Sequence, residues 1–506
     1  MTSTLDSETL GSGTQPVTVR SRAPRPIWSD DDVPADLIPE RYRLGESFVP
    51  KGRYLDAEFQ QIEVDRLFTK TWLMACRLED IPGVGSYYEY LIGGHSILVV
   101  RESTDTIRGY FNACRHRGTR LATGRGRVGA LICPFHGWRW NLDGSIRLVL
   151  DPEEFAPRSD DDLGLQPVQV DTWAGFVFIN MDLEAEPLLD YLDPLPEVFE
   201  PFHVENMRYR WMKSVIAPCN WKTVLDGFLE AYHVPGTHPQ LTRWDKRNHN
   251  IATLKELDRR AWSPTATFGK FARYASLGPK KSGESALESA KGPITEADLE
   301  ELGKDPSNKH IEGAKDERRS IADAVQYIAN DMQALETERS IRVAEQLRTA
   351  DVPDGMSAGQ YYLEMLRDAA TADGLDWPVI PPQAWAAAGT AWHVFPNTIL
   401  LPNQGCIIGY RARPNGKDPD SCLFEMFSLE QIPVADYDKK TDFLPQHFDD
   451  YRDAELGEVL TQDLDNSENV TIGMHSPSFD GHRLSTKQEM TIYNHHRAAD
   501  HYLWTD

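Results

Sequence analysis

The sequence has few cysteines and no long hydrophobic run, and each shortage excludes a class of protein. Six cysteines among 506 residues are too sparse for the disulfide framework of a small secreted domain. No stretch approaches the roughly 18 apolar residues that a membrane-spanning helix requires. The N-terminal segment has neither a basic start nor an apolar centre, so it does not indicate a secretory signal. We therefore expect a cytoplasmic protein without a membrane partner.

Positive charge is also scarce. Lysine and arginine total 53 against 78 aspartates and glutamates, which gives a formal net charge of −25. This excess repels polyanions and argues against nucleic acid as a partner, whereas a small-molecule substrate is compatible with it. Hydrophobic residues make up 40% of a chain longer than one ordinary domain, so two or three domains with sizeable cores are expected.

Two cysteine–histidine pairs carry the strongest signal, namely Cys114 with His116 and Cys133 with His136. Two thiolates on one iron and two imidazoles on the other form the ligand set of a Rieske [2Fe–2S] cluster. A structural zinc site uses the same ligand types, but zinc fingers usually combine a CxxC pair with a histidine doublet. One cysteine and one histidine in each loop therefore favour the Rieske cluster.

A second metal site is predicted in the segment NWKTVLDGFLEAYHVPGTHPQL. Asn220 is the expected N-cap of a helix on which Asp226, Glu230 and His233 share one stripe, at i, i+4 and i+7. Pro235 and Gly236 are then expected to break the helix. That break would let His238 return beside His233, and two imidazoles near a carboxylate form the facial triad that binds Fe(II).

The third ligand of this site should be a distant carboxylate. A helix is expected over residues 451–472, and Asp463 lies on its apolar face. A carboxylate that faces a core is costly unless it is paired or bound to a metal. Asp463 is therefore the expected ligand, although a salt-bridged aspartate would look similar, and Asp465 on the other side of the helix is the alternative. The apolar residues of this face are Leu456, Val459, Leu460 and Val470.

Residues 111–149, with FNACRHRGTRL, CPFHGWRW and NLDGS, resemble the N-terminal domain of the Rieske non-heme iron oxygenases. The resemblance, to the terminal oxygenase (α) subunits of the aromatic ring-hydroxylating type, covers most of residues 45–250 and 390–475. It implies an α+β fold, with a small all-β Rieske domain and a larger helix-grip-like catalytic domain built on a twisted antiparallel sheet with helices. The family's ligand aspartate follows a glutamine and precedes a glutamate by five residues, which matches Gln462-Asp463 and Glu468.

The resemblance also assigns a role to Glu230. In the family, the acidic residue at this position bridges the Rieske histidine of one subunit, here His136, to the metal histidine of its neighbour, here His233. That bridge implies a ring-like homotrimer. Many ring-hydroxylating members carry aspartate here, whereas glutamate is familiar in members that act on quaternary ammonium compounds. Asp226 is expected to be a partner of a ligand histidine, with a polar helix surface as the alternative.

The domain boundaries follow from these assignments. We expect a mobile or loosely docked arm at 1–45, the Rieske domain with a lead-in helix at 46–181, and the catalytic mononuclear iron domain at 182–506. A helix-rich insertion at about 251–390 is expected to cap the active site or to pad a subunit interface. The strand at 392–395 is expected either to line an apolar pocket or to pack in the core.

Five arginines lie beside the cluster ligands of this otherwise acidic chain. They are expected to form a docking surface for an acidic ferredoxin or reductase, or else a solvated loop without a special role. They are Arg115, Arg117, Arg120, Arg125 and Arg127.

The implied function is that of a terminal oxygenase, an oxidoreductase that receives electrons from a ferredoxin or reductase, and ultimately from NAD(P)H, through the Rieske cluster. It would activate O2 at a mononuclear Fe(II) and hydroxylate a hydrophobic aromatic or cyclic substrate, as a mono- or dioxygenase of aromatic hydrocarbon catabolism. The alternative is a Rieske monooxygenase that hydroxylates or demethylates a quaternary ammonium or N-methyl compound. A non-catalytic electron carrier would leave His233, His238 and Asp463 unexplained. Whether a separate β subunit joins the trimer stays open.

Overall fold

The computed structural model describes most of the chain. Residues 1–32 of the predicted arm, and residues 251–265 and 275–316 with some shorter stretches of the predicted insertion, lie outside the described residues. The described residues are 33–156, 159–230, 232–238, 266–268, 271–274, 317–330, 336–381, 384–385, 388–389, 391–437, 443–486 and 488–505.

The N-terminal half folds around an antiparallel sheet of seven strands in the order β2-β11-β10-β5-β4-β3-β6. Burial alternates along β3, as the period of two in a half-buried strand requires. A three-stranded sheet, β7-β8-β9, carries the second cysteine–histidine loop. The strands are β2 Leu73–Arg77, β3 Ser86–Ile92, β4 His95–Arg101, β5 Ile107–Phe111, β6 Arg125–Arg127, β7 Leu131–Ile132, β8 Arg139–Trp140, β9 Ile146–Leu148, β10 Pro167–Trp173 and β11 Phe176–Asn180.

The C-terminal half folds around an eight-stranded sheet in the order β13-β14-β15-β16-β17-β18-β12-β19. All its strand pairs are antiparallel except β12 with β19. The predicted α+β class, with a curled antiparallel sheet and helices, is therefore confirmed. The strands are β12 Met207–Ala217, β13 Ala266–Phe268, β14 Phe271–Tyr274, β15 Ala391–Val394, β16 Thr398–Asn403, β17 Cys406–Pro414, β18 Cys422–Gln431 and β19 Gln446–Phe448.

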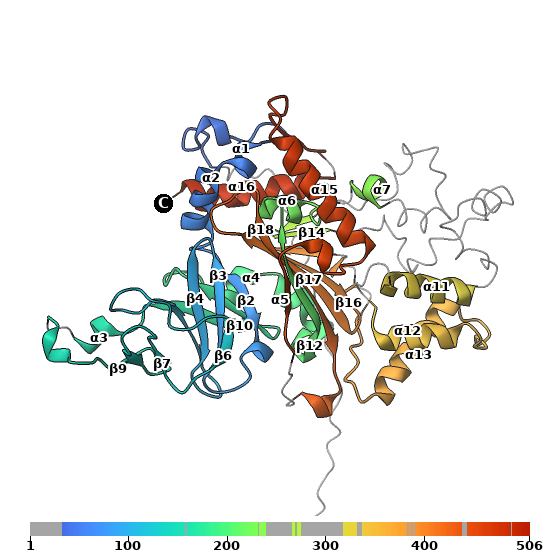
Figure 1. Ribbon diagram of the computed structural model, residues 1–506. Coiled ribbons are helices and arrows are strands. Elements are labelled where there is room, and N and C mark those ends of the chain that lie inside the picture. Colours follow the sequence, from blue (N-terminus) through green and yellow to red (C-terminus); the bar gives the residue numbers. More distant parts are fainter. Residues whose placement is uncertain are drawn as a thin grey trace, which may run out of the picture.

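Helices from three distant parts of the chain meet against this sheet (Figure 1). Helix α6 (Trp221–Asp226) contacts β17 and β18, and it is flanked by α15 (Glu458–Met474) and the C-terminal α16 (Met490–Trp504). The lead-in segment, formed by α1 (Gly52–Leu55), α2 (Ala57–Ile62) and a π-helix (Glu63–Leu67), packs beside α16. The lead-in helix that the sequence predicted is thus present.

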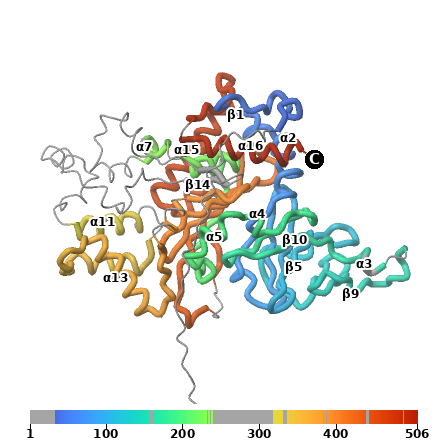
Figure 2. Tube along the Cα trace, turned by 180° about the vertical axis from the view of Figure 1, so that it is seen from behind, coloured from blue at the N-terminus to red at the C-terminus, as the bar shows by residue number. Residues whose placement is uncertain are grey.

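The small β-domain and the described helices of the predicted insertion lie on opposite sides of the large sheet (Figures 1 and 2). These helices, α11 (Glu317–Asn330), α12 (Glu338–Leu347) and α13 (Ala358–Ala372), share a hydrophobic core of their own. Their predicted role as a cap or an interface pad stays a prediction. None of the helices in the described part of the chain is long and apolar enough to cross a membrane.

Strand β17 of the large sheet lies against the small domain, and every residue along it is buried, with successive side chains pointing to opposite faces. Arg411 and Arg413 face the small domain, where their guanidinium groups donate to carbonyl oxygens of β2 and β3. Glu425 on β18 accepts from both, at 2.7 Å and 3.1 Å. These buried charges are therefore paired, and they hold the two domains in one orientation. Tyr410 points to the other face, towards α6.

Two details of the elements predicted from the sequence differ from the structure. The helix expected over 451–472 begins at Glu458, after Gly457 at φ 84°, and a 3-10 turn occupies Tyr451–Asp453. Val470, expected on its apolar face, is 41% exposed, because the buried face of α15 runs through Leu464, Ser467, Thr471 and Met474 and passes beside it. The strand at 392–395 packs in the main core, which supports the core alternative.

Candidate two-metal active site

Two tight turns present the first donor set. Cys114 and His116 follow β5, and Gly118 closes their turn by donating its N–H to the Cys114 carbonyl at 2.9 Å. Cys133 and His136 lie between β7 and β8, and Gly137 closes that turn on Cys133 at 3.1 Å. Both glycines have positive φ, at 78° and 74°, a conformation that other residues adopt at a cost.

The turns bring all four predicted cluster ligands together. The rings of His116 and His136 lie 4.6 Å apart between centroids, and both cysteines are buried and unbridged. Both imidazole Nδ1 atoms are enclosed and have no hydrogen-bond partner among the described residues. Orphaned buried nitrogens of this kind are costly unless a metal takes them, so the donor set fits a [2Fe–2S] cluster.

The two cluster thiols differ: burial raises the pKa of Cys114, whereas the lowered pKa of Cys133 agrees with this fit. Burial raises the pKa of Cys133, but the backbone N–H groups of His136 and Phe135 outweigh it and lower the net pKa. A thiolate is the form that binds iron. Burial, together with His116 and Arg117, lowers the pKa of His136 and favours the neutral ring that a metal requires.

The arginines beside the cluster loops all have partners within the chain. These partners do not remove the positive charge of the guanidinium groups, so they neither support nor exclude a docking surface. The docking surface therefore stays a prediction. Arg115 donates to the Asp162 carbonyl, Arg117 lies over the Phe135 ring, Arg120 pairs with Glu89, Arg125 with Asp80, and Arg127 donates to the Val84 carbonyl.

The second donor set is built differently from the expected helical stripe. Asn220 caps α6 as predicted, and its side chain accepts from Lys222 N at 3.1 Å. The helix, however, ends at Asp226, with Gly227 as its C-cap, so the expectation that one helix carries residues 226–233 is wrong. The chain then turns, and a separate helical turn, α7, runs over Val234–Thr237.

The predicted helix break at Pro235 and Gly236 is also wrong. Both residues lie inside α7, where a proline in the first turn gives up no helical hydrogen bond. His233 and His238 are the N-cap and C-cap of this turn. One turn of helix therefore sets the separation of the two histidines.

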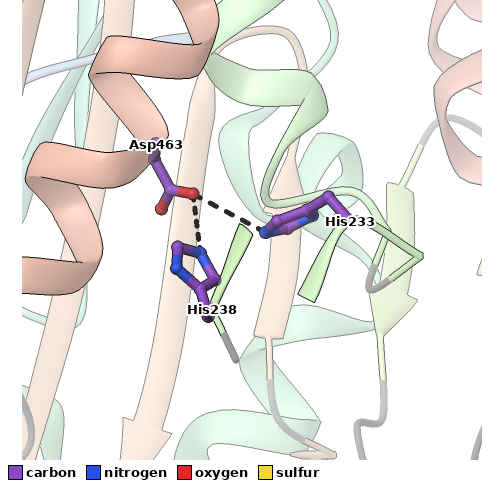
Figure 3. A group of neighbouring side chains, drawn as sticks. All are labelled: His233, His238 and Asp463. Carbon is purple, nitrogen blue, oxygen red and sulfur yellow. Dashed lines mark hydrogen bonds and ion pairs between the residues drawn. The ribbon is translucent and has the colours of Figure 1, made fainter. Parts of the chain in front are cut away.

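Asp463 of α15 completes the group (Figure 3). Its Oδ1 lies 2.8 Å from His238 Nε2 and 3.6 Å from His233 Nε2. The candidate ligand atoms lie within 4.8 Å of one another, and no other such group occurs in the part of the chain that the structure describes. Asp465, the alternative ligand, instead accepts from the Tyr451 hydroxyl at 2.6 Å.

Each ligand histidine has a hydrogen-bond acceptor at its Nδ1 atom. Glu230 Oε1 lies 2.6 Å from His233 Nδ1, and its Oε2 accepts from the His233 backbone N–H at 3.0 Å. Gln462 Oε1 lies 2.8 Å from His238 Nδ1. An acceptor at Nδ1 places the ring proton there and leaves Nε2 free for a metal, as in characterised metal sites.

The sequence predictions missed three neighbours of this site. The sequence marks Gln462 only as part of the family motif, and no local signal marks Tyr410 or Glu489. Tyr410 stacks on Phe228 at 4.2 Å, and the Asp463 charge acts on it. Glu489, the N-cap residue of α16, acts electrostatically on Glu230 and His233.

Carboxylates dominate the field around His233. Burial lowers its pKa, but Glu230, Asp463 and Glu489 outweigh burial and raise the net pKa. The arrangement therefore attracts cations, a divalent metal first of all.

Asp226 contacts neither ligand histidine. Its Oδ2 accepts from the Tyr54 hydroxyl instead, so the expected partnership with a histidine is wrong.

Gln462→Ala is expected to weaken mononuclear iron binding by about 10- to 100-fold, as the loss of a supporting hydrogen bond to a ligand histidine does elsewhere. Without Gln462 Oε1, the His238 ring can turn and change its tautomer. Competition with a chelator of known affinity measures the change. Asn469→Ala, at an exposed position of the same helix, is the control. Equal iron affinities in the two variants would contradict the role of Gln462.

The fold and the two donor sets together define a two-domain protein of the Rieske type with a second, mononuclear metal site. Residues 71–158 match the family model of the Rieske [2Fe-2S] domain, and residues 202–504 match that of the ring hydroxylating alpha subunit (catalytic domain). The chain belongs to this family of ring hydroxylating alpha subunits. The two domains imply a Rieske cluster and a mononuclear iron that works with O2.

Several relatives and solved structures resemble this chain. The glycine betaine monooxygenase oxygenase subunit of Chromohalobacter salexigens is 34% identical over 220 residues, which are 43% of this chain and 48% of that protein. The chain thus spans about half the length of the curated relatives it matches. A quaternary ammonium Rieske monooxygenase bound to L-carnitine has a TM-score of 0.56, with 16% identity over 93% of this chain and 99% of that one.

A second solved structure, naphthalene 1,2-dioxygenase from Rhodococcus sp. bound to indole, has a TM-score of 0.55. It is 17% identical over 91% of this chain and 95% of that one. At these identities the two structural likenesses show the fold alone.

Proposed function

We propose that this chain is the terminal oxygenase of a Rieske system. This proposal rests on two complete sets of metal ligands. One domain holds four soft or borderline ligands, and the other holds a group of two histidines and one carboxylate. A [2Fe–2S] cluster in the first set supplies one-electron transfer, and an iron in the second supplies O2 binding and reduction. The electrons come from NAD(P)H through a partner reductase or ferredoxin, and the protein works in the cytoplasm.

Glu230 is the proposed link between the sites of neighbouring subunits in a homotrimer. Within one chain it already holds His233, which is half of that bridge. The tip of the small domain supports the other half, because Phe135 beside His136 is 56% exposed and is flanked by other exposed apolar side chains. An exposed apolar tip gains stability when a second copy covers it. A separate β subunit is not required by this arrangement.

We propose a quaternary ammonium or N-methyl compound as the substrate. The charge around the second site carries this choice, since Glu230, Asp463 and Glu489 all act on His233. A bound Fe(II) offsets two of these three negative charges, and the remaining one favours a permanently cationic substrate over a neutral one. Glutamate rather than aspartate at position 230, and the glycine betaine monooxygenase relative, point the same way.

A hydrophobic aromatic or cyclic substrate is the second candidate, and with it ring dihydroxylation and aromatic hydrocarbon catabolism. The observation that favours it is a stack of three aromatic rings beside Asp463. Phe228, Tyr410 and Phe424 stack with centroid separations of 4.2 Å and 5.9 Å. Flat rings of this kind suit an aromatic guest as well as a cation.

A single turnover separates the candidates. Chemically reduced protein receives one pulse of O2 with a mixture of glycine betaine, L-carnitine, naphthalene and indole, and mass spectrometry identifies the product. We expect oxygen at an N-methyl group or a neighbouring carbon, with release of formaldehyde or trimethylamine. An oxygenated ring would move the assignment to the second candidate, and the number of added oxygens would distinguish one hydroxylation from two. Protein loaded with both metals that oxidised none of them would contradict both substrate classes.

A further inference from the structure

A chain of three hydrogen-bonded titratable side chains includes Asp226, which precedes Glu230 and His233 of the second metal site in the sequence. The Tyr54 hydroxyl is 2.7 Å from Asp226 Oδ2 and 2.9 Å from His496 Nε2. Tyr54 and His496 are each 1% exposed. The three residues come from α1, α6 and α16, which meet only in the folded chain (Figure 1). None of them belongs to the cluster site or the mononuclear site.

The Asp226 carboxyl group lacks the donors that an ionised carboxylate needs. Its Oδ1 is enclosed and has no hydrogen-bond partner among the described residues. A bare oxygen of an ionised carboxylate costs far more than the carbonyl oxygen of a neutral carboxyl group. The neighbouring cation, Lys222, is already engaged by both oxygens of Glu63, at 2.8 Å each. The geometry therefore favours a protonated Asp226.

The surrounding charges also favour a protonated Asp226. Burial raises the pKa of Asp226 to about 8, and the charges of Glu230 and Glu489 add to it, against the Tyr54 hydrogen bond and Lys222. On the other side of Tyr54, burial and the cation Arg53 hold the pKa of His496 well below its usual value. The other titratable or charged groups that act on His496 are His482, His495 and Lys222.

The hydroxyl between these two groups can carry a proton without any movement of heavy atoms. In one state Asp226 donates its proton to the Tyr54 oxygen, and Tyr54 donates to His496 Nε2. In the other, Tyr54 donates to an ionised Asp226, and a protonated His496 Nε2 donates to Tyr54. One proton therefore passes from His496 to Asp226 by a shift of two hydrogen atoms along two existing hydrogen bonds.

We propose that His496, Tyr54 and Asp226 form a proton relay that feeds the second metal site, an inference that rests on the proposed oxygenase function. Hydroxylation of a substrate RH by O2 takes up two electrons and two protons and yields ROH and water. The electrons come from the partner reductase, O2 is reduced, and the substrate C–H bond is oxidised. Asp226 supplies one of the protons and becomes ionised. A solvent proton taken up at His496 then passes through Tyr54 and restores the carboxyl group, and the low pKa of His496 makes this last transfer favourable. The Glu230 charge acts on Asp226, and Glu230 in turn holds His233, so this carboxylate connects the relay with the metal site.

Infrared spectroscopy of the metal-loaded protein tests the resting state without any turnover. We expect a protonated-carboxyl C=O band at neutral pH that disappears with an alkaline midpoint, and that is missing in Asp226→Asn. Tyr54→Phe removes the hydrogen bond that stabilises the ionised form, so the midpoint should move to higher pH. Tyr451→Phe is the matched control, because that hydroxyl also donates to an aspartate, the half-exposed Asp465. A band that survives in Asp226→Asn, or equal midpoints in the two tyrosine variants, would overturn the relay.

Turnover gives the second readout and keeps this inference separate from the proposed function. In Asp226→Asn we expect kcat to fall by on the order of 100-fold, the usual contribution of a positioned proton donor, with KM nearly unchanged and Asp226→Glu partly restoring the rate. Tyr54→Phe covers the case in which Asp226→Asn does not fold, and it should lower kcat with an enlarged solvent isotope effect. Wild-type protein that forms product while both variants keep its rate would remove the relay and leave the oxygenase intact. Wild-type protein without oxygenase activity would instead contradict the proposed function.

Discussion

Asp463→Ala is expected to abolish product formation while the Rieske cluster remains intact. Asp463 supplies the only negative ligand of the mononuclear group, and its Oδ1 is the atom on which both histidine Nε2 atoms converge. Two neutral imidazoles alone hold a divalent cation poorly. The loss of the metal removes several kcal/mol of charge stabilisation, which corresponds to a rate decrease of about 1000-fold or more.

The cluster should survive this change because the two donor sets belong to different domains. The turns after β5 and β7 hold the cluster ligands, and among the described residues no hydrogen bond or ion pair joins these turns to α15. Iron analysis should show the loss of the mononuclear iron, while the visible spectrum of the cluster stays unchanged. Loss of the cluster spectrum as well would point to a general folding defect.

Asp465→Asn is the matched control on the same helix. Asp465 is half-exposed and accepts from Tyr451, so its replacement should leave the iron content and the activity close to wild type. The reverse pattern, with iron lost from Asp465→Asn and kept in Asp463→Ala, would make Asp465 the ligand. The sequence alone left these two aspartates as alternatives, and the pair of variants decides between them.

The cluster ligands could be predicted from the sequence because the information is local. Each loop holds a cysteine and a histidine within four residues, and a glycine that closes the turn follows each loop. The signal for the His233–His238 pair is equally local, although the helix break that was expected between the two histidines does not occur. A helical period fitted the stripe of Asp226, Glu230 and His233, but α6 ends before Gly227, and a separate turn carries the histidines.

Contacts between distant segments could not be predicted in the same way. Gln462 meets His238 across 224 positions, and Tyr54 meets Asp226 across 172. Nothing in the local pattern of Glu489 distinguishes it from a surface glutamate, because its proximity to His233 arises only when α16 packs beside α6. Val470 shows the converse error. Its spacing is close to the helical period, but the buried face of α15 passes through Ser467 and Thr471 and leaves Val470 at its exposed edge.

Glu230→Gln is expected to keep both metals and to lose coupled turnover, with product per reduced cluster falling by on the order of 100-fold. The glutamine amide oxygen can still accept from His233 Nδ1, so the ring keeps its orientation and tautomer. The variant loses the negative charge, and its amide nitrogen cannot accept the backbone hydrogen bond that Oε2 now receives at 3.0 Å. Because the Glu230 charge helps to raise the pKa of His233, that pKa should fall in the metal-free variant.

Single-turnover experiments separate coupling from metal loading. In Glu230→Gln the cluster should still be reduced and iron should remain bound, but O2 should oxidise the cluster slowly and with little product. Glu468→Gln makes the same chemical change at the surface of α15, where Glu468 pairs with Arg452, and it should turn over like the wild type. Normal product formation by Glu230→Gln would show that electrons reach the second site by another route. The exposed tip at Phe135 would then need a different explanation from contact with the neighbouring subunit, because without the Glu230 bridge nothing requires one chain's cluster to face the next chain's His233.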